Sequence, residues 1–286
     1  TLIIGPGVTL IFNGPFKVLV HGVLNALGTN EAPVLLTSGT TPPGAGDWEG
    51  VHFETSGTGM LSGATIEYAH HGVRADEASL DLQHLQARFC NTGVHVTGTS
   101  ASPRLDHVSL LENGIGLELS WAGWSQDIFV NYSTISQNNT GITATGSSGL
   151  RLWNSQVLDN AGVGAHLDGA TLWHNIIAGN GTGLVTQGGW DNCTRSVIEA
   201  NDVGVQLGIY PTRFTANHNR IAVNTSFSFV YGGGYDDGAV NAEHNWWDAS
   251  TSGSIAESIW DFFDDTSLFY VDFLPYLRSP LTSVGP

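Results

Sequence analysis

The sequence has little charge, and very little of it is positive. Charged residues make up 12% of the 286 positions, against about 25% in average soluble proteins, and nine Lys and Arg face 26 Asp and Glu. The resulting formal charge of −17 would repel a phosphate backbone, so we expect no nucleic-acid partner. A hydrophobic content of 41% excludes a disordered chain.

Long apolar runs and a cysteine framework are also missing. No apolar run reaches the roughly 18 residues that a membrane span requires, so we expect none. The first residues, TLIIGPG, contain neither a basic segment nor a cleavage site, so we expect that the chain is already processed or was cut from something longer. The two cysteines, Cys90 and Cys193, are too few for a disulfide-stabilised scaffold and leave the compartment open.

What the sequence does contain is glycine and a repeated asparagine. The 37 glycines indicate many tight turns. Asparagine recurs at steps of 22, 25, 22, 20, 21, 23 and 21 residues, and an aliphatic residue stands three positions before most of the members. The recurring positions are Asn91, Asn113, Asn138, Asn160, Asn180, Asn201, Asn224 and Asn245. The period predicts a solenoid with about 22 residues per coil.

Two solenoid architectures have this period, the leucine-rich repeat and the parallel β-helix. The coils lack the L-x-x-L-x-L run and a helical return, and instead have short Val-, Ile- and Thr-rich segments interrupted by Gly. We therefore predict an all-β, right-handed parallel β-helix, with its asparagines stacked as a structural amide ladder. The two cysteines would lie about five coils apart, too far for a disulfide.

The N-terminal third contains the motifs V-x-G-x-L-x-A-x-GT, P-V-x-x-T-S, GDW-x-G-V-x-F and I-E-Y-A in this order. They occupy Val18 to Thr29, Pro33 to Ser38, Gly46 to Phe53 and Ile66 to Ala69. With these motifs the chain resembles the secreted right-handed parallel β-helix repeat proteins of the pectate-lyase-like superfamily. The resemblance implies export to the extracellular space or cell surface. Members include polysaccharide lyases, hydrolases, esterases and adhesins, so the fold does not choose among activities.

We predict one domain over residues 1–286. Residues 1–90 would form N-terminal coils, 91–245 the regular asparagine-ladder coils, and 246–286 a C-terminal cap with a short amphipathic helix over residues 254–265. Thr1 begins directly in the coil pattern, so we expect further N-terminal β-helix or a neighbouring subunit to cover this end. Asp261, Asp264 and Asp265 in the cap could bind Ca²⁺, although helix-surface acids are the simpler interpretation, and no other cofactor is expected.

Loops of variable length follow the Gly-containing strand at one phase of the coil, and such loops project from one face of a solenoid. They contain aromatic and acidic residues, which suit stacking on sugar rings and hydrogen bonding to hydroxyls. The candidate carbohydrate-binding residues are Trp121, Trp124, Trp190, Tyr210, Tyr231, Tyr235 and Asp236. Asp191 and Asp237, two coils apart at similar offsets, are the best candidates for a catalytic carboxylate pair.

The spacing of the histidines does not predict a metal site. His107, His174 and His218 share one offset but stand two or three coils apart, which is too far for one metal, and His70 and His71 follow a strand without ligand spacing. Three functions stay open. They are a carbohydrate-binding or adhesive module that binds a polysaccharide, a carbohydrate-active enzyme (a hydrolase rather than a lyase), and a structural segment of a larger surface protein.

Overall fold

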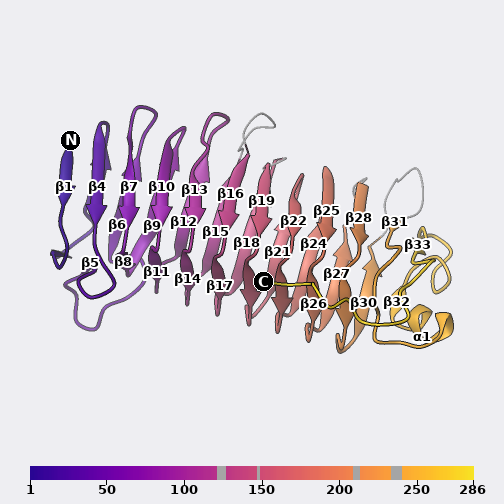
Figure 1. Cartoon of the computed structure of the whole chain (residues 1–286). Helices are drawn as coiled ribbons and strands as arrows, with labels where there is room; N and C mark the ends of the chain where they lie inside the picture. Colours follow the sequence, from indigo (N-terminus) through magenta and orange to yellow (C-terminus); the bar gives the residue numbers. More distant parts are fainter. Residues whose placement is uncertain (121–126, 147–148, 209–212, 233–239) are drawn as a thin grey trace.

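The computed structural model describes residues 1–120, 127–146, 149–208, 213–232 and 240–286, and the described chain is a parallel β-helix (Figure 1). Each coil contributes one strand to each of three parallel sheets, called sheets A, B and C, which have 12, 10 and 11 strands in the described ranges. Neighbouring strands within a sheet are about one coil apart in sequence, as the asparagine period predicted. The predicted right-handed β-helix is confirmed.

The sheets are built as follows. Sheet A contains β1 (Leu2–Ile4), β4 (Val23–Leu27), β7 (Thr58–Ser62), β10 (Ser79–Gln83), β13 (Arg104–Asp106), β16 (Ile128–Asn131), β19 (Leu150–Trp153), β22 (Thr171–Trp173), β25 (Trp190–Thr194), β28 (Arg213–Asn217), β31 (Val240–Asn241) and β33 (Val271–Asp272). Sheet B contains β2 (Thr9–Phe12), β5 (Val34–Ser38), β8 (Ala64–Glu67), β11 (Gln86–Arg88), β14 (Ser109–Leu111), β17 (Thr134–Ser136), β20 (Gln156–Leu158), β23 (Ile176–Ala178), β26 (Val197–Glu199) and β29 (Arg220–Ala222). Sheet C contains β3 (Lys17–Val20), β6 (Trp48–Phe53), β9 (Ala69–Asp76), β12 (Thr92–Thr97), β15 (Ile115–Ser120), β18 (Thr140–Thr145), β21 (Val163–Leu167), β24 (Thr182–Thr186), β27 (Val203–Leu207), β30 (Phe227–Tyr231) and β32 (Ile259–Trp260).

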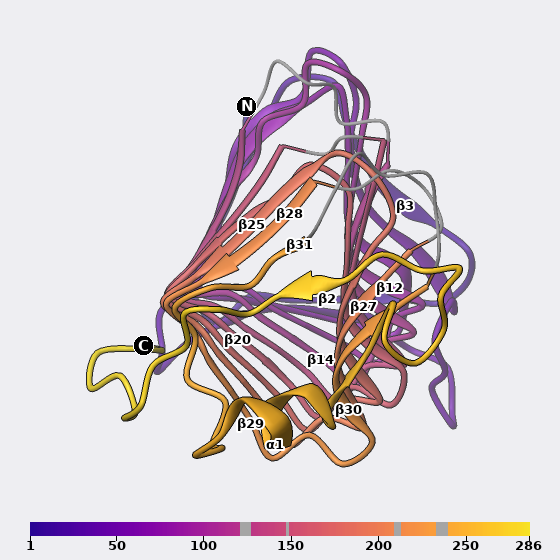
Figure 2. The same cartoon turned by 90° about the vertical axis from the view of Figure 1, so that its right-hand side faces the viewer.

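Seen along the axis, the three sheets form the sides of a tube that encloses the core (Figure 2). Side chains alternate in and out along each strand, so one residue type repeats on top of itself from coil to coil. The aliphatic residues three positions before the asparagines form one such internal row in sheet B, and all of them are fully buried. The row is Leu110, Ile135, Val157, Ile177, Ile198 and Ile221.

The amide ladder lies at the corner between sheets B and C. The Oδ1 of Asn160 accepts from both the backbone N and Nδ2 of Asn138, each at 3.0 Å, and its own Nδ2 donates to Asn180 Oδ1 at 2.9 Å. The same pattern runs without a break from Asn113 to Asn224. Each amide thus satisfies backbone groups of the coil before it, at a corner where sheet hydrogen bonds stop.

Two of the eight predicted ladder members were wrong. Cys90, whose backbone N donates to Asn113 Oδ1 at 2.9 Å, occupies the ladder position, and Asn91 beside it is exposed. Asn245 belongs to a second ladder at the corner between sheets A and B, because its Oδ1 accepts from Asn219 N at 2.8 Å. Its spacing from Asn224 matched the period by coincidence: in the four preceding coils this corner follows the corner between sheets B and C by 15 to 18 residues, whereas Asn245 follows Asn224 by 21.

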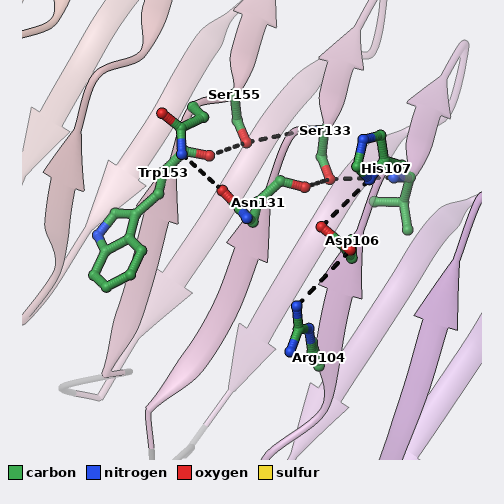
Figure 3. A network of polar contacts seen from close by, with 9 residues as sticks. Arg104, Asp106, His107, Asn131, Ser133, Trp153 and Ser155 are labelled. Carbon is green, nitrogen blue, oxygen red and sulfur yellow. Dashed lines mark hydrogen bonds and ion pairs between the residues drawn. The ribbon is translucent and has the colours of Figure 1, made fainter. Parts of the chain in front are cut away.

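The second ladder uses serine as well as asparagine. Its members are Ser133, Ser155, Asn175, Ser196, Asn219 and Asn245. The serine hydroxyls accept from the coil before and donate within their own corner: Ser133 Oγ to Asn131 O at 2.8 Å and Ser155 Oγ to Trp153 O at 2.7 Å (Figure 3). Because the residue type changes from coil to coil, the sequence period did not reveal this column.

The ends and the cysteines complete the fold. The one helix in the described ranges, α1 (Ser252–Ala256), is shorter than the predicted helix over residues 254–265, because residues 259–260 leave it to pair with β30. No helix in these ranges is long and apolar enough to span a bilayer.

Both cysteines are free, as predicted. Both are also buried, and burial raises the pKa of each thiol to about 12. The expected cover for the first coil stays a prediction.

Replacing Asn160 with Ala should lower the free energy of unfolding by roughly 2–4 kcal/mol, because the buried backbone N of Asn138 loses its acceptor. The measurement is the urea midpoint followed by circular dichroism. Asn91→Ala is the matched control, because Asn91 is exposed and outside the ladder; its effect should stay within about 0.5 kcal/mol. Equal effects in the two variants would contradict the ladder's role.

Candidate functional site

Most of the predicted loop residues are not among those that the structure describes. Trp121, Trp124, Tyr210, Tyr235, Asp236 and Asp237 lie outside the described residues. The described members of the predicted set are Trp190, Asp191 and Tyr231, and they differ in which way they face.

Trp190 lies on the outer face of sheet A, at the start of β25, and 70% of its surface is exposed. Its register partner in the next coil is Arg213, whose guanidinium lies 4.8 Å from the centroid of the indole ring. A guanidinium over an indole face is a cation–π contact, which holds the ring in place while leaving it accessible.

Asp191 and Tyr231 face the interior, contrary to the expectation of a surface position. Because Trp190 points outward, strand alternation turns Asp191 inward, where it is 2% exposed and accepts from Ala170 N at 2.7 Å. Its second oxygen is buried without a hydrogen-bond partner, and burial raises the pKa of the carboxyl to about 7. Tyr231 is 4% exposed, with its ring 6.2 Å from that of Phe269.

The outer face of sheet A carries further aromatic rings that sequence reasoning missed. Phe129 and Trp173 are 38% and 39% exposed, and Trp153 between them packs edge-on against Phe129 at 5.5 Å. Trp153 and Trp173 are direct register partners. Both precede the corner residue in the aligned segments RLWN and TLWH, so their equal offset was a usable signal. We call Phe129, Trp153, Trp173 and Trp190 the aromatic face.

Polar groups lie among these rings. Arg151, the register partner of Phe129, forms an ion pair with Asp127 at 2.9 Å and donates to Thr171 Oγ1 at 2.8 Å. The indole Nε1 of Trp153 is buried with no hydrogen-bond partner. The aromatic face therefore combines flat apolar surface with hydrogen-bonding groups.

A second cluster lies on the outer face of sheet C, on a different side of the tube. His71, His95 and Glu118 come from the neighbouring strands β9, β12 and β15, and their donor atoms all lie within 4.8 Å of one another. The rings of His71 and His95 have centroids 5.0 Å apart. The prediction that His71 is not a metal ligand rested on local spacing, but steps of 24 and 23 residues place these three side chains in adjacent coils.

The imidazoles of this cluster are neutral and lack partners. His71 Nδ1 and both ring nitrogens of His95 are buried without a hydrogen bond. Burial lowers the pKa of His95 and brings that of His71 to about 3, so neither ring is charged at neutral pH. Neutral imidazole nitrogens beside a carboxylate form a donor set for divalent transition metals.

The other candidate ligands do not form such a set among the described residues. Asp261 accepts from Val271 N at 2.8 Å and from Phe263 N at 3.0 Å, and Asp265 accepts from Ser267. These carboxylates therefore stabilise turns of the C-terminal cap. Two of the histidines that share one offset have a further histidine beside them. The ring centroids of His84 and His107 are 5.0 Å apart, and those of His218 and His244 are 5.4 Å apart. His107 also contacts Asp106 at the corner (Figure 3).

The model for the family described as periplasmic copper-binding protein (NosD) matches residues 38–251, which is more than half of the chain. The chain belongs to the NosD family. The matched segment of this NosD family member contains both the aromatic face and the His71–His95–Glu118 cluster. The family description places the family in the periplasm.

Two solved structures are similar to this NosD family member. The pectate lyase Pel9A has 15% sequence identity and a TM-score of 0.39, with 82% of this chain and 70% of that chain covered. The alginate lyase from Paenibacillus sp. str. FPU-7 has 12% identity and a TM-score of 0.28, with 90% and 91% covered. No curated protein matches the sequence. At these values neither likeness bears on the activity of this chain.

Asp191 makes stability depend on pH. Its folded pKa of about 7 lies above the ordinary value of 3.8, so the folded state binds this proton more tightly and stability falls as pH rises between these two values. The slope amounts to about 1.4 kcal/mol per pH unit within this window. Lowered histidine pKa values, above all that of His71, act in the opposite direction and make stability rise with pH in part of this range. In thermal unfolding at pH 5 and pH 8, the wild type should therefore lose stability at pH 8 relative to Asp191→Asn, which lacks the titrating carboxyl.

Asp202→Asn is the control for this measurement. Asp202 is exposed, and hydrogen bonds from Ser226 and Thr225 lower its pKa, so its replacement should leave the wild-type change in stability between pH 5 and pH 8 as it is. An unchanged pH dependence in Asp191→Asn would contradict the assignment.

Proposed function

We propose that this chain is an exported carbohydrate-binding module that holds a polysaccharide on the aromatic face of sheet A. The observation that carries the proposal is the exposure of Trp190 and Trp173, at 70% and 39%, on the regular surface of one sheet. Contiguous exposed apolar surface is typical of sites where a ligand or partner binds.

The chemistry of the face matches a sugar chain. The C–H faces of pyranose rings stack on aromatic rings, and their hydroxyls need hydrogen-bonding groups beside the rings. Arg151 and Thr171, which hydrogen-bond to each other beside the rings, supply such groups. Trp153 and Trp173 stand in register one coil apart, about 4.8 Å along the tube. Phe129 and Trp190 lie two and four residues before that line on their own strands, so the rings spread across the outer face of sheet A, where a sugar chain could lie against several of them.

The open alternatives differ in what supports them. Export is supported by the periplasmic description of the family. A hydrolase would need the carboxyl of Asp191 at the surface, and its inward orientation gives that alternative no support. A role as a structural segment of a larger surface protein needs no defined ligand and does not account for the exposed tryptophans.

A second candidate function is copper binding. It is favoured by the His71–His95–Glu118 cluster, because its imidazole and carboxylate donors are those that copper binds and the family is described as copper-binding. The cluster and the aromatic face lie on different sheets, so the two functions are compatible.

The test is binding to a panel of neutral and acidic polysaccharides by affinity electrophoresis and calorimetry. We expect each of Trp173→Ala and Trp190→Ala to weaken binding about ten-fold, because each removes a stacking surface worth about 1–2 kcal/mol.

Trp260→Ala is the matched control, because Trp260 is 40% exposed but lies on sheet C, and it should bind like the wild type. Binding that is absent from the whole panel, or that is equally weakened by Trp260→Ala, would overturn the proposal.

A further inference from the structure

The fold brings His71, His95 and Glu118 together through strand register. His95 of β12 and Glu118 of β15 are direct register partners, and β9, which carries His71, pairs with β12 on the other side. The register between β6 and β9 shifts after Gly50, so that Gly72 has no partner in β6. Such irregularities redirect side chains, and here the shift follows directly after His71.

Gly50 is required by this arrangement. It has a φ of +106° and pairs with His71, and a Cβ at this position would collide with the carbonyl oxygen of His71. The backbone on both sides of His71 is therefore closely fitted, which fixes the place of its imidazole on the sheet.

Several polar atoms of the cluster are buried without a hydrogen-bond partner. Three buried ring nitrogens of His71 and His95 lack hydrogen-bond partners, and leaving buried polar atoms unpaired is costly. Glu118 is held near them, since Thr92 Oγ1 lies 3.4 Å from its Oε2. A metal ion would give these nitrogens a partner and would bring positive charge to the carboxylate.

A further imidazole, that of His52 on β6, lies beside His71. Its ring centroid lies 6.0 Å from that of His71, and its Nε2 lies 2.9 Å from the carbonyl oxygen of Glu49. Because a carbonyl only accepts, Nε2 carries the proton and Nδ1 keeps a free lone pair. A hydrogen bond from the other ring nitrogen to a carbonyl is the usual way in which a metal-binding histidine is oriented.

Arg74 lies beside the cluster, and Lys17 is a second cation near His52 in the described part of the chain. Arg74 pairs in register with both His52 and His95, yet its Nε donates to Asp76 Oδ1 at 2.9 Å. This ion pair directs the guanidinium along its own strand and offsets its charge, so that a dication beside His95 meets less repulsion.

We propose that His71, His95 and Glu118 form a Cu(II) site, with His52 as the fourth ligand. The inference rests on the copper-binding candidate function and is independent of glycan binding. Two ligands on one metal, each bonded at about 2 Å, stand at most about 4 Å apart, so small side-chain rotations from the present separation of up to 4.8 Å bring the donor atoms of His71, His95 and Glu118 to one metal. His52, whose ring centroid lies 6.0 Å from that of His71, needs a larger rotation to join them. Among divalent ions, Cu²⁺ binds nitrogen and oxygen donors most tightly.

The experiment is titration of the full chain with Cu²⁺, followed by calorimetry and electron paramagnetic resonance. We expect one tight site per chain, with hyperfine coupling to imidazole nitrogens. His71→Ala and His95→Ala should each weaken binding at least about ten-fold and reduce the number of coupled nitrogens. His52→Ala should remove one coupled nitrogen and keep the site.

His166→Ala is the matched control. His166 lies in the same outward row of sheet C, two coils beyond Glu118, and burial lowers its pKa as well, but it has no second imidazole beside it among the described residues. This variant should bind Cu²⁺ like the wild type, and circular dichroism should show all variants folded.

Tight binding that survives in both His71→Ala and His95→Ala, or that is lost equally in His166→Ala, would overturn the site. Absence of tight binding in the wild type would do so as well. Glycan binding measured on the same variants separates the two functions, because loss of the copper site leaves the aromatic face unchanged, and Trp190→Ala leaves the copper spectrum unchanged.

Discussion

The parallel pairing of each coil with the next is the constraint on which the rest of this structure depends. Backbone hydrogen bonds join strands that are about one coil apart in sequence, and they hold all three sheets in one register. Residues with the same offset in successive coils thereby become neighbours. At the corners, where this pairing is interrupted, two columns of buried asparagine and serine side chains supply the missing acceptors.

Both candidate sites are consequences of this stacking. Trp153 and Trp173 are register partners on sheet A, and His95 and Glu118 are register partners on sheet C. In neither case does a loop or a separate domain assemble the residues. A solenoid can therefore place two unrelated chemistries on different sides of one tube, each built from a few adjacent coils, and each open to change without disturbing the shared core.

The buried polar groups of this structure differ in how completely they are hydrogen-bonded. The amides of the ladders are almost fully paired, and they add stability because every buried donor finds an acceptor. The carboxyl of Asp191 is inside the same tube with one oxygen unpaired, which is why burial dominates its pKa. The buried nitrogens of His71 and His95 are likewise unpaired, but they belong to half-buried side chains on the outer face of sheet C.

The sequence by itself determined the β-helix, its coil length, the buried aliphatic row and the free state of both cysteines, because each follows from a period that is visible in the residues. It did not determine which residue of a coil occupies a corner: Cys90 replaces Asn91 in one ladder, and Asn245 belongs to the other. Nor did it show that Asp191 faces inward, since one residue of register reverses the direction of a side chain. The tertiary structure alone decided that His71, His95 and Glu118 converge, because their distances depend on strand register and on the shift after Gly50.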